Sequence, residues 1–351
     1  MTNRRIAVVG AGALGGYVGG WLAQLGQDVT FIDPWPQNVE TIRAKGLELD
    51  GMTPAERCVV TKAKILHLTE LQGNRRPFDV AMVAMKSYDT AWATQLVAPH
   101  LAPGGYVVSL QNCLNEETIA GIVGWGRTVG VIASMISVDL YEAGRIRRTV
   151  SKGGDQHTVF RIGEPHGRVS RRVEEMVEWF SGIDSAKATT NLWGERWTKL
   201  VQNGMGNGVA AATGLTSSAC LRDEGIRHFQ IKLAGEAVRV GQALGYQLEK
   251  MKGLDPERYA LANEGDAAAL EEVENAIIPK QANPRENIQR PSMAQDILKG
   301  RRTEIDAMNG AIAGKGREIG VAAPSHARLT EIVTRVERGE LKPGRENVTR
   351  L

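Results

Sequence analysis

The sequence of 351 residues predicts an α/β protein in which a domain built on a parallel sheet is followed by an all-helical domain. In the first half of the chain, short apolar runs alternate with helical stretches, the pattern of a parallel sheet covered on both faces. Beyond Asn191 the strand signals fade and long helical segments replace them. Because a chain of this length usually forms more than one domain, we expect the two patterns to mark two domains.

The expected elements follow one another in a simple order. Short apolar strands are predicted at 6–9, 29–32, 79–85, 106–110, 128–133 and 159–163, with an excursion at 46–68. Helices are predicted at 14–25, 89–101, 192–212, 225–244, 266–278 and 293–320. We place the sheet domain at 1–188, the helical domain at 189–338 and a flexible, charged tail at 339–351.

The composition is that of an ordinary globular protein with nearly balanced charge. Apolar residues make up 42% of the chain, charged residues 24%, and the net charge is +3. This balance predicts neither nucleic acid nor membrane as a partner, and no apolar run is long enough to cross a bilayer. Cys58, Cys113 and Cys220 are widely spaced, which fits a reducing compartment and no zinc site. We therefore expect a cytoplasmic protein with no metal site.

The most specific motif lies at the N-terminus, where the apolar run 6–9 leads into Gly10-Ala11-Gly12-Ala13-Leu14-Gly15. In such a turn the first glycine allows a tight bend, the second lets a pyrophosphate approach, and the third lets helix and strand pack closely. The following helix would present free N–H groups to the phosphates. Gly10, Gly12, Ala13, Leu14 and Gly15 are therefore the expected cofactor-binding turn of a Rossmann-type domain. A purely structural glycine turn is the alternative.

Asp33 ends the second expected strand, near the offset of about 20 residues at which a carboxylate binds the adenosine ribose. A carboxylate at this position would repel the 2′-phosphate of NADP(H). We therefore predict a preference for NAD(H), with NADP(H) as the alternative and Arg43 as its candidate phosphate partner.

Two further polar side chains follow expected strands, at the sheet edge where open α/β sheets bind ligands. Lys86 follows the run that ends at Met85, and Asn112 follows the run that ends at Leu110. We expect Lys86 beside the dinucleotide and Asn112 near the nicotinamide ribose. The alternative is a surface lysine and a turn asparagine.

The helical half carries Lys199, Asn203 and Asn207 four residues apart, which places them on one face of a helix. An ammonium and two amides among apolar residues are unfavourable in a core and suitable for lining a pocket. Glycines follow at 204, 206 and 208. Since glycine weakens a helix, we expect something to approach the backbone closely there.

Two polar positions lie further along the chain. Ser292 either contacts a ligand or caps a helix, with Gln295 as its capping-box partner. Glu304 belongs either to a pocket or to the surface. The Glu- and Ala-rich segment 255–290 before them is interpreted either as a lid at a pocket mouth or as a solvated helical excursion.

In their order and spacing these motifs resemble the ketopantoate reductase family over nearly the whole chain. The resemblance rests on the glycine turn, Lys86, Gln111-Asn112, Lys199/Asn203/Asn207, Ser292-Met-Ala-Gln-Asp296, Arg302-Thr-Glu304-Ile-Asp306 with Asn309-Gly310, and Gly320-Val-Ala-Ala-Pro324.

The resemblance implies reduction of a 2-oxo acid by hydride from a nicotinamide cofactor. Lys199 matches the family's catalytic lysine, which protonates the carbonyl oxygen as hydride reaches the carbon. Glu304 matches the family's active-site acid. The resemblance also assigns substrate contacts to Asn203, Asn207, Ser292 and Asn112, and puts Lys86 and Asn112 at the junction of cofactor and substrate.

The chain departs from the family pattern in places that leave the substrate open. The family usually uses NADPH, with a basic or neutral residue where this chain has Asp33. Ser217 stands where members commonly carry an asparagine, and the segment 255–290 is longer than expected. Ketopantoate, a larger 2-oxo acid or a ketone therefore remain candidates, in either reaction direction. An opine or 3-hydroxy acid dehydrogenase and a non-catalytic NAD(P) sensor are the alternatives, and a homodimer is expected.

Overall fold

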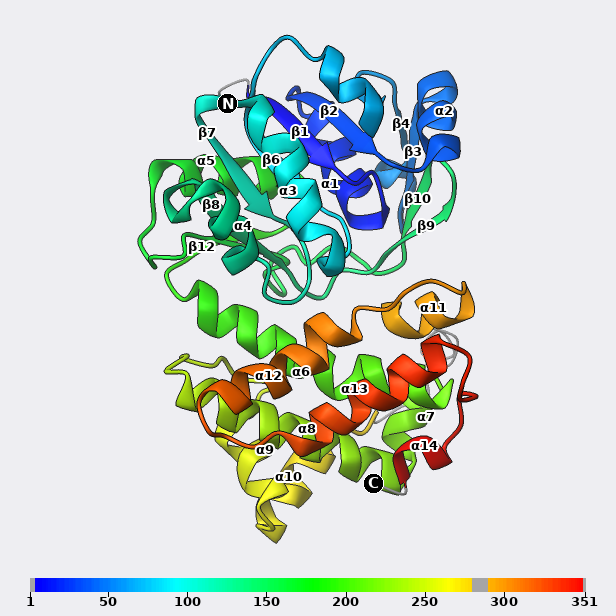
Figure 1. Cartoon of the computed structure of the whole chain (residues 1–351), viewed down its shortest axis with the longest axis vertical. Helices are drawn as coiled ribbons and strands as arrows, with labels where there is room; N and C mark the ends of the chain where they lie inside the picture. Colours follow the sequence, from blue (N-terminus) through cyan, green and yellow to red (C-terminus); the bar gives the residue numbers. More distant parts are fainter. Residues whose placement is uncertain (1–3, 280–289, 350–351) are drawn as a thin grey trace. The chain divides into compact units, whose positions relative to one another are not determined.

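The computed structural model describes residues 4–279 and 290–349. Its contacts divide the chain into a sheet unit, Met1–Leu192, and a helical unit, Trp193–Leu351. This division falls a few residues beyond the expected boundary at 188. Figure 1 shows strands confined to the first unit and helices filling the second, which confirms the predicted fold class.

The main sheet of the sheet unit has the strand order β12-β11-β8-β7-β6-β1-β2-β5. Its strands are β1 (Arg5–Val9), β2 (Asp28–Asp33), β5 (Lys64–His67), β6 (Phe78–Val83), β7 (Leu101–Ser109), β8 (Thr128–Ala133), β11 (Phe160–Gly163) and β12 (Ala186–Thr189). All neighbouring strands are parallel except β8 and β11, which pair antiparallel. Thus β1, which leads into the glycine turn, lies inside the sheet between β2 and β6.

Different helices cover the two faces of this sheet, because successive residues of a strand point to opposite faces. The helices are α1 (Ala13–Gln24), α2 (Pro36–Lys45), α3 (Thr90–Val97), α4 (Glu116–Val123) and α5 (Arg171–Ser181). Ile6 and Val8 of β1 belong to a core with α1 and α5, whereas Ala7 and Val9 belong to a core with α3 and α4. A strand buried on both faces is apolar at every position, which is why the run 6–9 predicts it.

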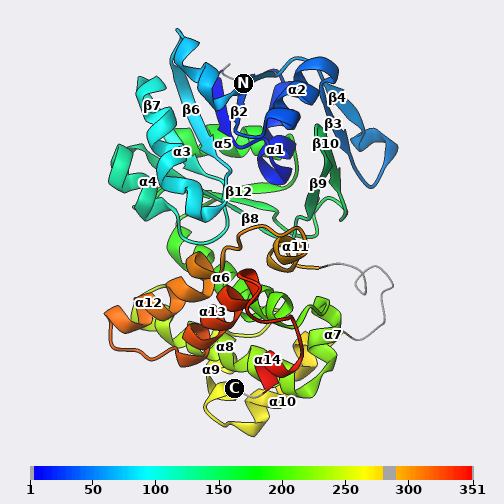
Figure 2. The ribbon, with the colours of Figure 1, turned by 45° about the vertical axis from the view of Figure 1, so that its right-hand side comes forward.

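A second sheet, with the order β4-β3-β10-β9, lies beside α1 (Figure 2). Its strands are β3 (Leu47–Asp50), β4 (Cys58–Val60), β9 (Val138–Glu142) and β10 (Arg145–Arg148). Gly16 of α1 has no room for a side chain because Ile146 of β10 occupies that space. The excursion predicted at 46–68 therefore contains strands that pair with a distant part of the chain and cover α1.

The helical unit contains ten helical segments among the described residues. They are α6 (Leu192–Thr213), α7 (Ser217–Arg222), α8 (Glu224–Ala243), α9 (Pro256–Asn263), α10 (Ala267–Ile277), α11 (Ser292–Leu298), the π-helix η6 (Asp306–Gly310), α12 (Ala311–Glu318), α13 (Pro324–Glu337) and α14 (Glu346–Thr349). Trp197 of α6 is buried against Gly241 of α8 and donates its indole N–H to the carbonyl of Ala237 at 2.9 Å.

The single helix predicted at 293–320 is wrong, because the structure ends α11 at Leu298. Gly300 has a positive φ of +60°, and its N–H bonds to the carbonyl of Ile297 at 3.1 Å. The N–H of Arg301 bonds to the carbonyl of Asp296 at 2.8 Å. These two bonds form a Schellman motif, which stops the helix and satisfies its last carbonyls.

The described part of the segment 255–290 is helical and packed. Arg239 of α8 forms ion pairs with Glu257 at 2.8 Å and Glu264 at 2.5 Å, at the two ends of α9. Gly235 of α8 leaves space for Asn263, so the backbones of α8 and α9 lie close together. These contacts hold residues 256–263 on α8, and residues 280–289 lie outside the described residues.

The end of the chain, where a flexible tail is expected, makes specific contacts as far as it is described. Arg345 bonds to the carboxylate of Asp223, and Asn347 donates to the carbonyl of Ala212 at 2.8 Å. Val348 is buried. Residues 344–349 are therefore packed on α6 and on the start of α8.

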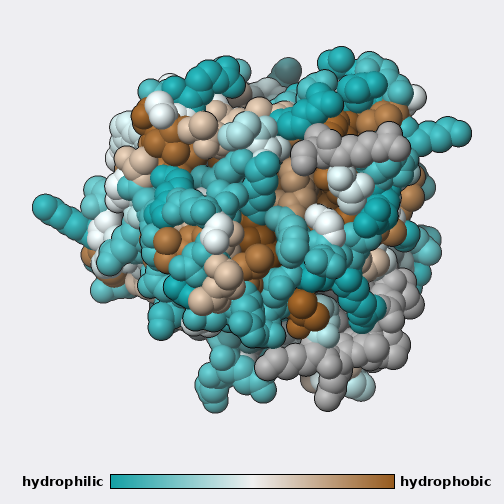
Figure 3. Space-filling view, turned by 90° about the horizontal axis from the view of Figure 1, so that it is seen from below, coloured by the Kyte–Doolittle hydropathy of each residue, from teal (hydrophilic) through white to brown (hydrophobic). Residues whose placement is uncertain are grey.

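None of the described helices is both long and apolar enough to cross a membrane. Figure 3 shows hydrophilic side chains over much of one face of the molecule, with separate patches of hydrophobic side chains among them.

His326 gives the helical unit a predictable response to acid. Its ring is fully buried, and burial lowers its pKa to about 4 from the ordinary 6.5. Below pH 6.5 the unfolded chain binds a proton at this site that the folded chain does not bind until about pH 4. We expect His326 to remove about 3 kcal/mol from the free energy of unfolding as the pH falls through this window.

Urea unfolding of the wild type and of His326→Asn, measured between pH 7 and pH 4, checks this expectation. The wild type should lose more stability than the variant over that range. Equal losses would show that His326 titrates normally in the folded chain.

Candidate functional site

The glycine turn has the shape that a bound dinucleotide requires. Gly10 has a φ of +102° and donates its N–H to the carbonyl of Ile32 at 2.8 Å, so the chain bends sharply after β1. A Cβ at Gly15 would overlap with the carbonyl oxygen of Gly10, so this position needs glycine for close packing. The first turn of α1 has no side-chain cap and no acidic residue, which keeps its positive end available for phosphate.

Gly12 differs from its two neighbours because the space beside it is open. A Cβ at Gly12 would meet no protein atom within 4 Å, and its backbone is extended, with φ −72° and ψ −167°. Protein packing therefore does not explain a glycine here, whereas close approach of a pyrophosphate does. The turn thus fits the nicotinamide dinucleotide that the sequence predicts.

This difference predicts opposite effects for two valine substitutions. Gly12→Val should fold with a wild-type Tm but bind NADH at least about 100-fold more weakly, since its side chain fills the space for the pyrophosphate. Gly15→Val should lower the Tm, because its side chain collides with Gly10. Thermal unfolding and NADH titration by fluorescence measure both effects. Unchanged NADH affinity in Gly12→Val would rule out the turn as the pyrophosphate site.

Asp33 holds the glycine turn in place from the end of β2. Its carboxylate accepts hydrogen bonds from the N–H groups of Ala11 at 2.7 Å and Trp35 at 2.9 Å. Burial raises the pKa of Asp33, and these hydrogen bonds oppose that rise. A carboxylate has about four acceptor positions, so Asp33 retains capacity for ribose hydroxyls.

Arg43 is already engaged by acidic neighbours. Its guanidinium forms ion pairs with Glu40 at 2.8 Å and with Glu70 at 2.7 Å. A 2′-phosphate would have to compete with both carboxylates for this side chain.

Lys86 and Asn112 lie on two loops that the structure ties together. Their strands β6 and β7 are neighbours, so both loops leave the same edge of the sheet. Gln111 donates from its side-chain amide to the carbonyl of Met85 at 2.8 Å, and Asn115 donates to the hydroxyl of Ser87 at 3.2 Å. Both predicted site residues are half-buried. The network fixes the backbone of each loop relative to the other.

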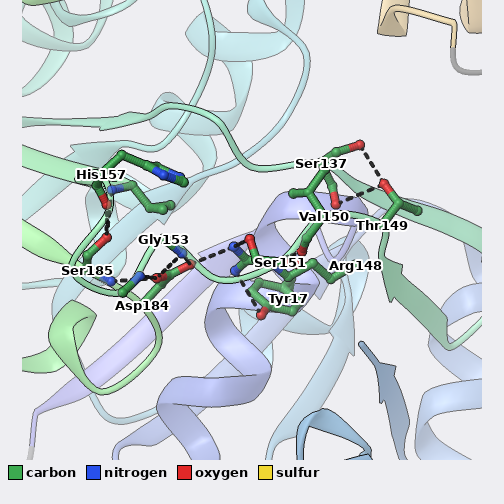
Figure 4. A network of polar contacts seen from close by, with 12 residues as sticks. Tyr17, Ser137, Arg148, Thr149, Val150, Ser151, Gly153, His157, Asp184 and Ser185 are labelled. Atoms are coloured by element: carbon green, nitrogen blue, oxygen red, sulfur yellow. Dashed lines mark hydrogen bonds and ion pairs between the residues drawn. The ribbon is translucent and has the colours of Figure 1, made fainter. Parts of the chain in front are cut away.

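A buried ion pair contacts α1 through the side chain of Tyr17 (Figure 4). Arg148 and Asp184 are both about 1% or less exposed at their side chains and lie 2.6 Å apart. Arg148 also contacts the hydroxyl of Tyr17 at 3.3 Å, and Asp184 accepts from the N–H of Gly153 at 2.9 Å. Tyr17 belongs to the second turn of α1, so the ion pair connects α1 to β10 and to the loop before β12.

In the helical unit, Lys199, Asn203 and Asn207 lie on the single helix α6, as the spacing predicts. All three are half-buried. The structure thus brings an ammonium and two amides onto one partly accessible stripe.

The three glycines beside this stripe serve different purposes. A Cβ at Gly204 would lie 3.1 Å from Ile312, and one at Gly208 would lie 2.9 Å from Leu329, so both accommodate neighbouring helices. At Gly206 the nearest atom is the amide nitrogen of Gln230, at 3.9 Å. The expected close approach is therefore made by protein at Gly204 and Gly208, whereas a side chain at Gly206 would make only an ordinary contact with Gln230.

Gln230 of α8 is a polar residue that the sequence analysis did not single out. It is buried, and its side-chain oxygen has no hydrogen-bond partner within the described structure. Its amide nitrogen faces Gly206, 3.9 Å from where a Cβ would lie. A lone glutamine in an amphipathic helix gives no sequence signal for such a position.

Ser292 and Glu304 occupy contrasting environments. The expected capping box at Ser292 is wrong, because Pro291 is the N-cap of α11 and Gln295 donates its side-chain amide to the carbonyl of Arg290. Ser292 is exposed as the first residue of that helix. Glu304 is only 6% exposed, which excludes the alternative of a surface acid.

The predicted site residues thus form two groups. The sheet unit holds the glycine turn, Asp33, Lys86 and Asn112, and the helical unit holds Lys199, Asn203, Asn207, Ser292 and Glu304. The first group has the form of a dinucleotide site. The second supplies a cation, amides, a hydroxyl and a buried carboxyl group.

Comparisons with known proteins agree with this arrangement. Residues 6–160 match the model of the ketopantoate reductase PanE/ApbA family, and residues 191–337 match that of its C-terminal domain. The 2-dehydropantoate 2-reductase of Pyrococcus horikoshii is 30% identical over 94% of this chain and 96% of its own length. That of Archaeoglobus fulgidus is 28% identical over 97% of this chain and 100% of its own.

Solved structures share the fold. A PanE/ApbA family ketopantoate reductase from Ralstonia eutropha has a TM-score of 0.76 at 26% identity, covering 95% of this chain and 99% of its own. D-mandelate dehydrogenase in a ternary structure with NADH and anilino(oxo)acetate has a TM-score of 0.77 at 21% identity, covering 95% and 98%. Together with the two matched domains, these likenesses lead to one conclusion: the chain belongs to the ketopantoate reductase family.

Proposed function

We propose that this protein is a nicotinamide-dependent oxidoreductase that reduces a 2-oxo acid to its 2-hydroxy acid, with Lys199 as the proton donor. The observation that carries the proposal is the half-buried stripe of Lys199, Asn203 and Asn207 on α6. In a family of 2-dehydropantoate 2-reductases, such a stripe offers a cation to the carbonyl oxygen and amides to the rest of the substrate.

The cofactor supplies the hydride when bound. Gly12 and the first turn of α1 would hold its pyrophosphate, Asp33 would accept from its adenosine ribose, and Lys86 and Asn112 would contact it from the loops after β6 and β7.

Lys199 holds the proton that the reaction consumes. As hydride reaches the carbonyl carbon, the oxygen gains negative charge, and the ammonium stabilises that charge before transferring a proton to it. Glu304, which matches the family's active-site acid, acts beside the lysine, and the lysine regains its proton from solvent after product leaves. Asn203, Asn207 and Ser292 orient the substrate, with Asn112 at its junction with the cofactor.

The substrate is a small 2-oxo acid, with ketopantoate and aromatic 2-oxo acids as the two candidates to separate first. The relatives named above support the former, and the fold shared with D-mandelate dehydrogenase keeps the latter open. A panel of 2-oxo acids, ketones and their alcohols, assayed by nicotinamide absorbance with both cofactors, identifies substrate and direction. Failure of every 2-oxo acid would contradict the proposal and favour the alternatives of an opine or 3-hydroxy acid dehydrogenase or a nucleotide sensor.

We further propose that NADH is the preferred cofactor. Asp33 is the last residue of β2, where we expect the adenosine ribose to bind. Its carboxylate would repel the negatively charged 2′-phosphate of NADPH. We expect kcat/KM for NADH to exceed that for NADPH by at least about 10-fold, since 1.4 kcal/mol of repulsion corresponds to that factor. Steady-state rates with each cofactor measure the ratio. A higher kcat/KM with NADPH would contradict the preference.

Asp33→Asn is the matched variant for this preference. It keeps an acceptor oxygen for one of the two backbone N–H groups, loses the acceptor for the other, and removes the charge. The ratio of kcat/KM for NADH to kcat/KM for NADPH should therefore fall. An unchanged ratio would mean that another group selects the cofactor.

We also propose a cytoplasmic homodimer, since a long helical domain suits self-association and the three cysteines, all among the described residues, form no disulfide. Light scattering should give twice the mass of the chain.

A further inference from the structure

The segment after Glu304 is held by a buried polar relay that connects it to the helix carrying Lys199. Glu304 is followed by the π-helix η6, which runs directly into α12. A π-turn is an uncommon backbone form that is frequent at functional sites and needs support from its surroundings. The support here comes from Asn309, which lies within η6 and is fully buried.

Asn309 bonds to two different helices. Its side-chain nitrogen donates to the carbonyl oxygen of Gly204 on α6 at 2.8 Å. The same nitrogen lies 3.0 Å from Nδ1 of His326 on α13. Gly204 directly follows Asn203, so Asn309 joins η6 to the middle of the stripe of Lys199, Asn203 and Asn207.

The chemistry of His326 fixes the direction of these bonds. Its Nε2 lies 2.8 Å from the carbonyl oxygen of Leu233 on α8, and a carbonyl only accepts, so Nε2 carries the proton. In the neutral ring Nδ1 is then an acceptor, and Asn309 must present its NH₂ group to it. Asn309 therefore donates a hydrogen bond to His326, and His326 donates one to the carbonyl of Leu233.

The same helix α8 also holds the backbone of His326. The carboxylate of Glu236 accepts from the N–H groups of Ser325 at 3.0 Å and His326 at 3.4 Å, at the start of α13. The ring and the backbone of His326 are thus both anchored on α8. The absence of a side chain at Gly208 lets Ile305, the neighbour of Glu304, pack directly on α6, and the absence of one at Gly204 makes room for the ring of His326 and for Ile312.

From this geometry we propose that Asn309 and His326 are positioning residues that set the placement of Glu304 relative to Lys199. The proposal rests on the proposed function of these two groups. Asn309 lies five residues after Glu304, and it bonds to Gly204, which lies five residues after Lys199. His326 in turn holds the side chain of Asn309. Loss of the relay displaces the carboxyl group from the lysine and slows proton transfer, while cofactor binding in the sheet unit is untouched.

Two substitutions of His326 separate positioning from simple loss of stability. His326→Asn places an amide oxygen where Nδ1 was, which keeps the acceptor for Asn309 and loses the bond to Leu233. His326→Gln keeps a donor for Leu233 and loses the acceptor for Asn309. Each variant loses one buried hydrogen bond, so both should have a lower Tm. Tyr259→Phe, which loses the 3.1 Å bond to the carbonyl of Met251 away from the relay, is the matched control.

We expect His326→Gln and Asn309→Leu to lower kcat by about 10- to 100-fold, as a misplacement of about 1 Å does, with the KM for NADH unchanged. His326→Asn should keep kcat within about threefold of the wild type, and Tyr259→Phe should leave it unchanged. Rates are expressed per NADH-binding site, counted by titration, so that unfolded protein does not contribute. If Asn309→Leu does not fold, the kcat of His326→Gln is compared with that of His326→Asn instead.

Equal kcat values for His326→Gln and His326→Asn would overturn the positioning role, as would a wild-type kcat in Asn309→Leu. Lys199→Ala, measured alongside, keeps the two proposals apart. If it loses turnover while the relay variants do not, only the relay fails. If it retains wild-type turnover, the proposed function fails and the positioning role falls with it.

Discussion

Lys199→Ala is expected to lower kcat by about 10²- to 10⁴-fold, the contribution of a well-placed general acid. The variant loses both the ammonium that stabilises the developing alkoxide and the proton that neutralises it. Its affinity for NADH should remain that of the wild type, because the glycine turn and Asp33 belong to the sheet unit. Turnover with the accepted 2-oxo acid and NADH titration measure the two quantities independently.

Two further variants complete this test. Lys199→Arg keeps the positive charge but holds its proton too tightly to donate it, so it should bind substrate and turn over slowly. Gln202→Ala removes an exposed side chain from the same helix and should leave kcat unchanged. Wild-type turnover in Lys199→Ala would remove the lysine from the mechanism.

The second large effect concerns stability. Arg148→Met is expected to lower the free energy of unfolding by about 3–5 kcal/mol, since it leaves the carboxylate of Asp184 buried without its cation. Burial opposes ionisation of Asp184, but hydrogen bonds from Ser185 and Arg148 and the charge of Arg148 keep the pKa of its carboxyl group below the ordinary value. The carboxylate is therefore charged at neutral pH in the wild type, and the variant removes the cation that it pairs with.

Urea unfolding followed by tryptophan fluorescence measures this loss. The double variant Arg148→Met/Asp184→Leu should lose less than the sum of the two single variants, because it leaves no unpaired charge. Glu40→Ala removes an exposed ion pair with Arg43 and should change stability by less than about 1 kcal/mol. A loss in Arg148→Met as small as that of Glu40→Ala would show that the buried pair is not needed.

The local parts of the fold and site are predictable from the sequence because their signals are local. The run 6–9 and the glycine turn predict β1 and α1, and the spacing of four predicts that Lys199, Asn203 and Asn207 share a face of α6. These inferences need only strand and helix periodicity and the steric limits of glycine.

The non-local parts were not predictable in the same way. β3 is a short strand that pairs with β10, about a hundred residues later, so its own sequence carries little signal. The break after Leu298 depends on Gly300 adopting a positive φ, although a glycine inside a helical pattern is often tolerated. Gly204, Gly206 and Gly208 look alike in the sequence, and only the packing shows that Gly204 and Gly208 are tightly packed and Gly206 is not.

Hydride transfer to a 2-oxo acid is the central claim, and isotope transfer tests it most directly. The accepted substrate is reduced with NADH carrying deuterium at one or the other face of nicotinamide C4, and the hydroxy acid is analysed by mass spectrometry and NMR. We predict that one of the two labelled cofactors places deuterium on C2 of the product and that the other gives unlabelled product. A hydroxy acid free of deuterium with both cofactors would contradict the account.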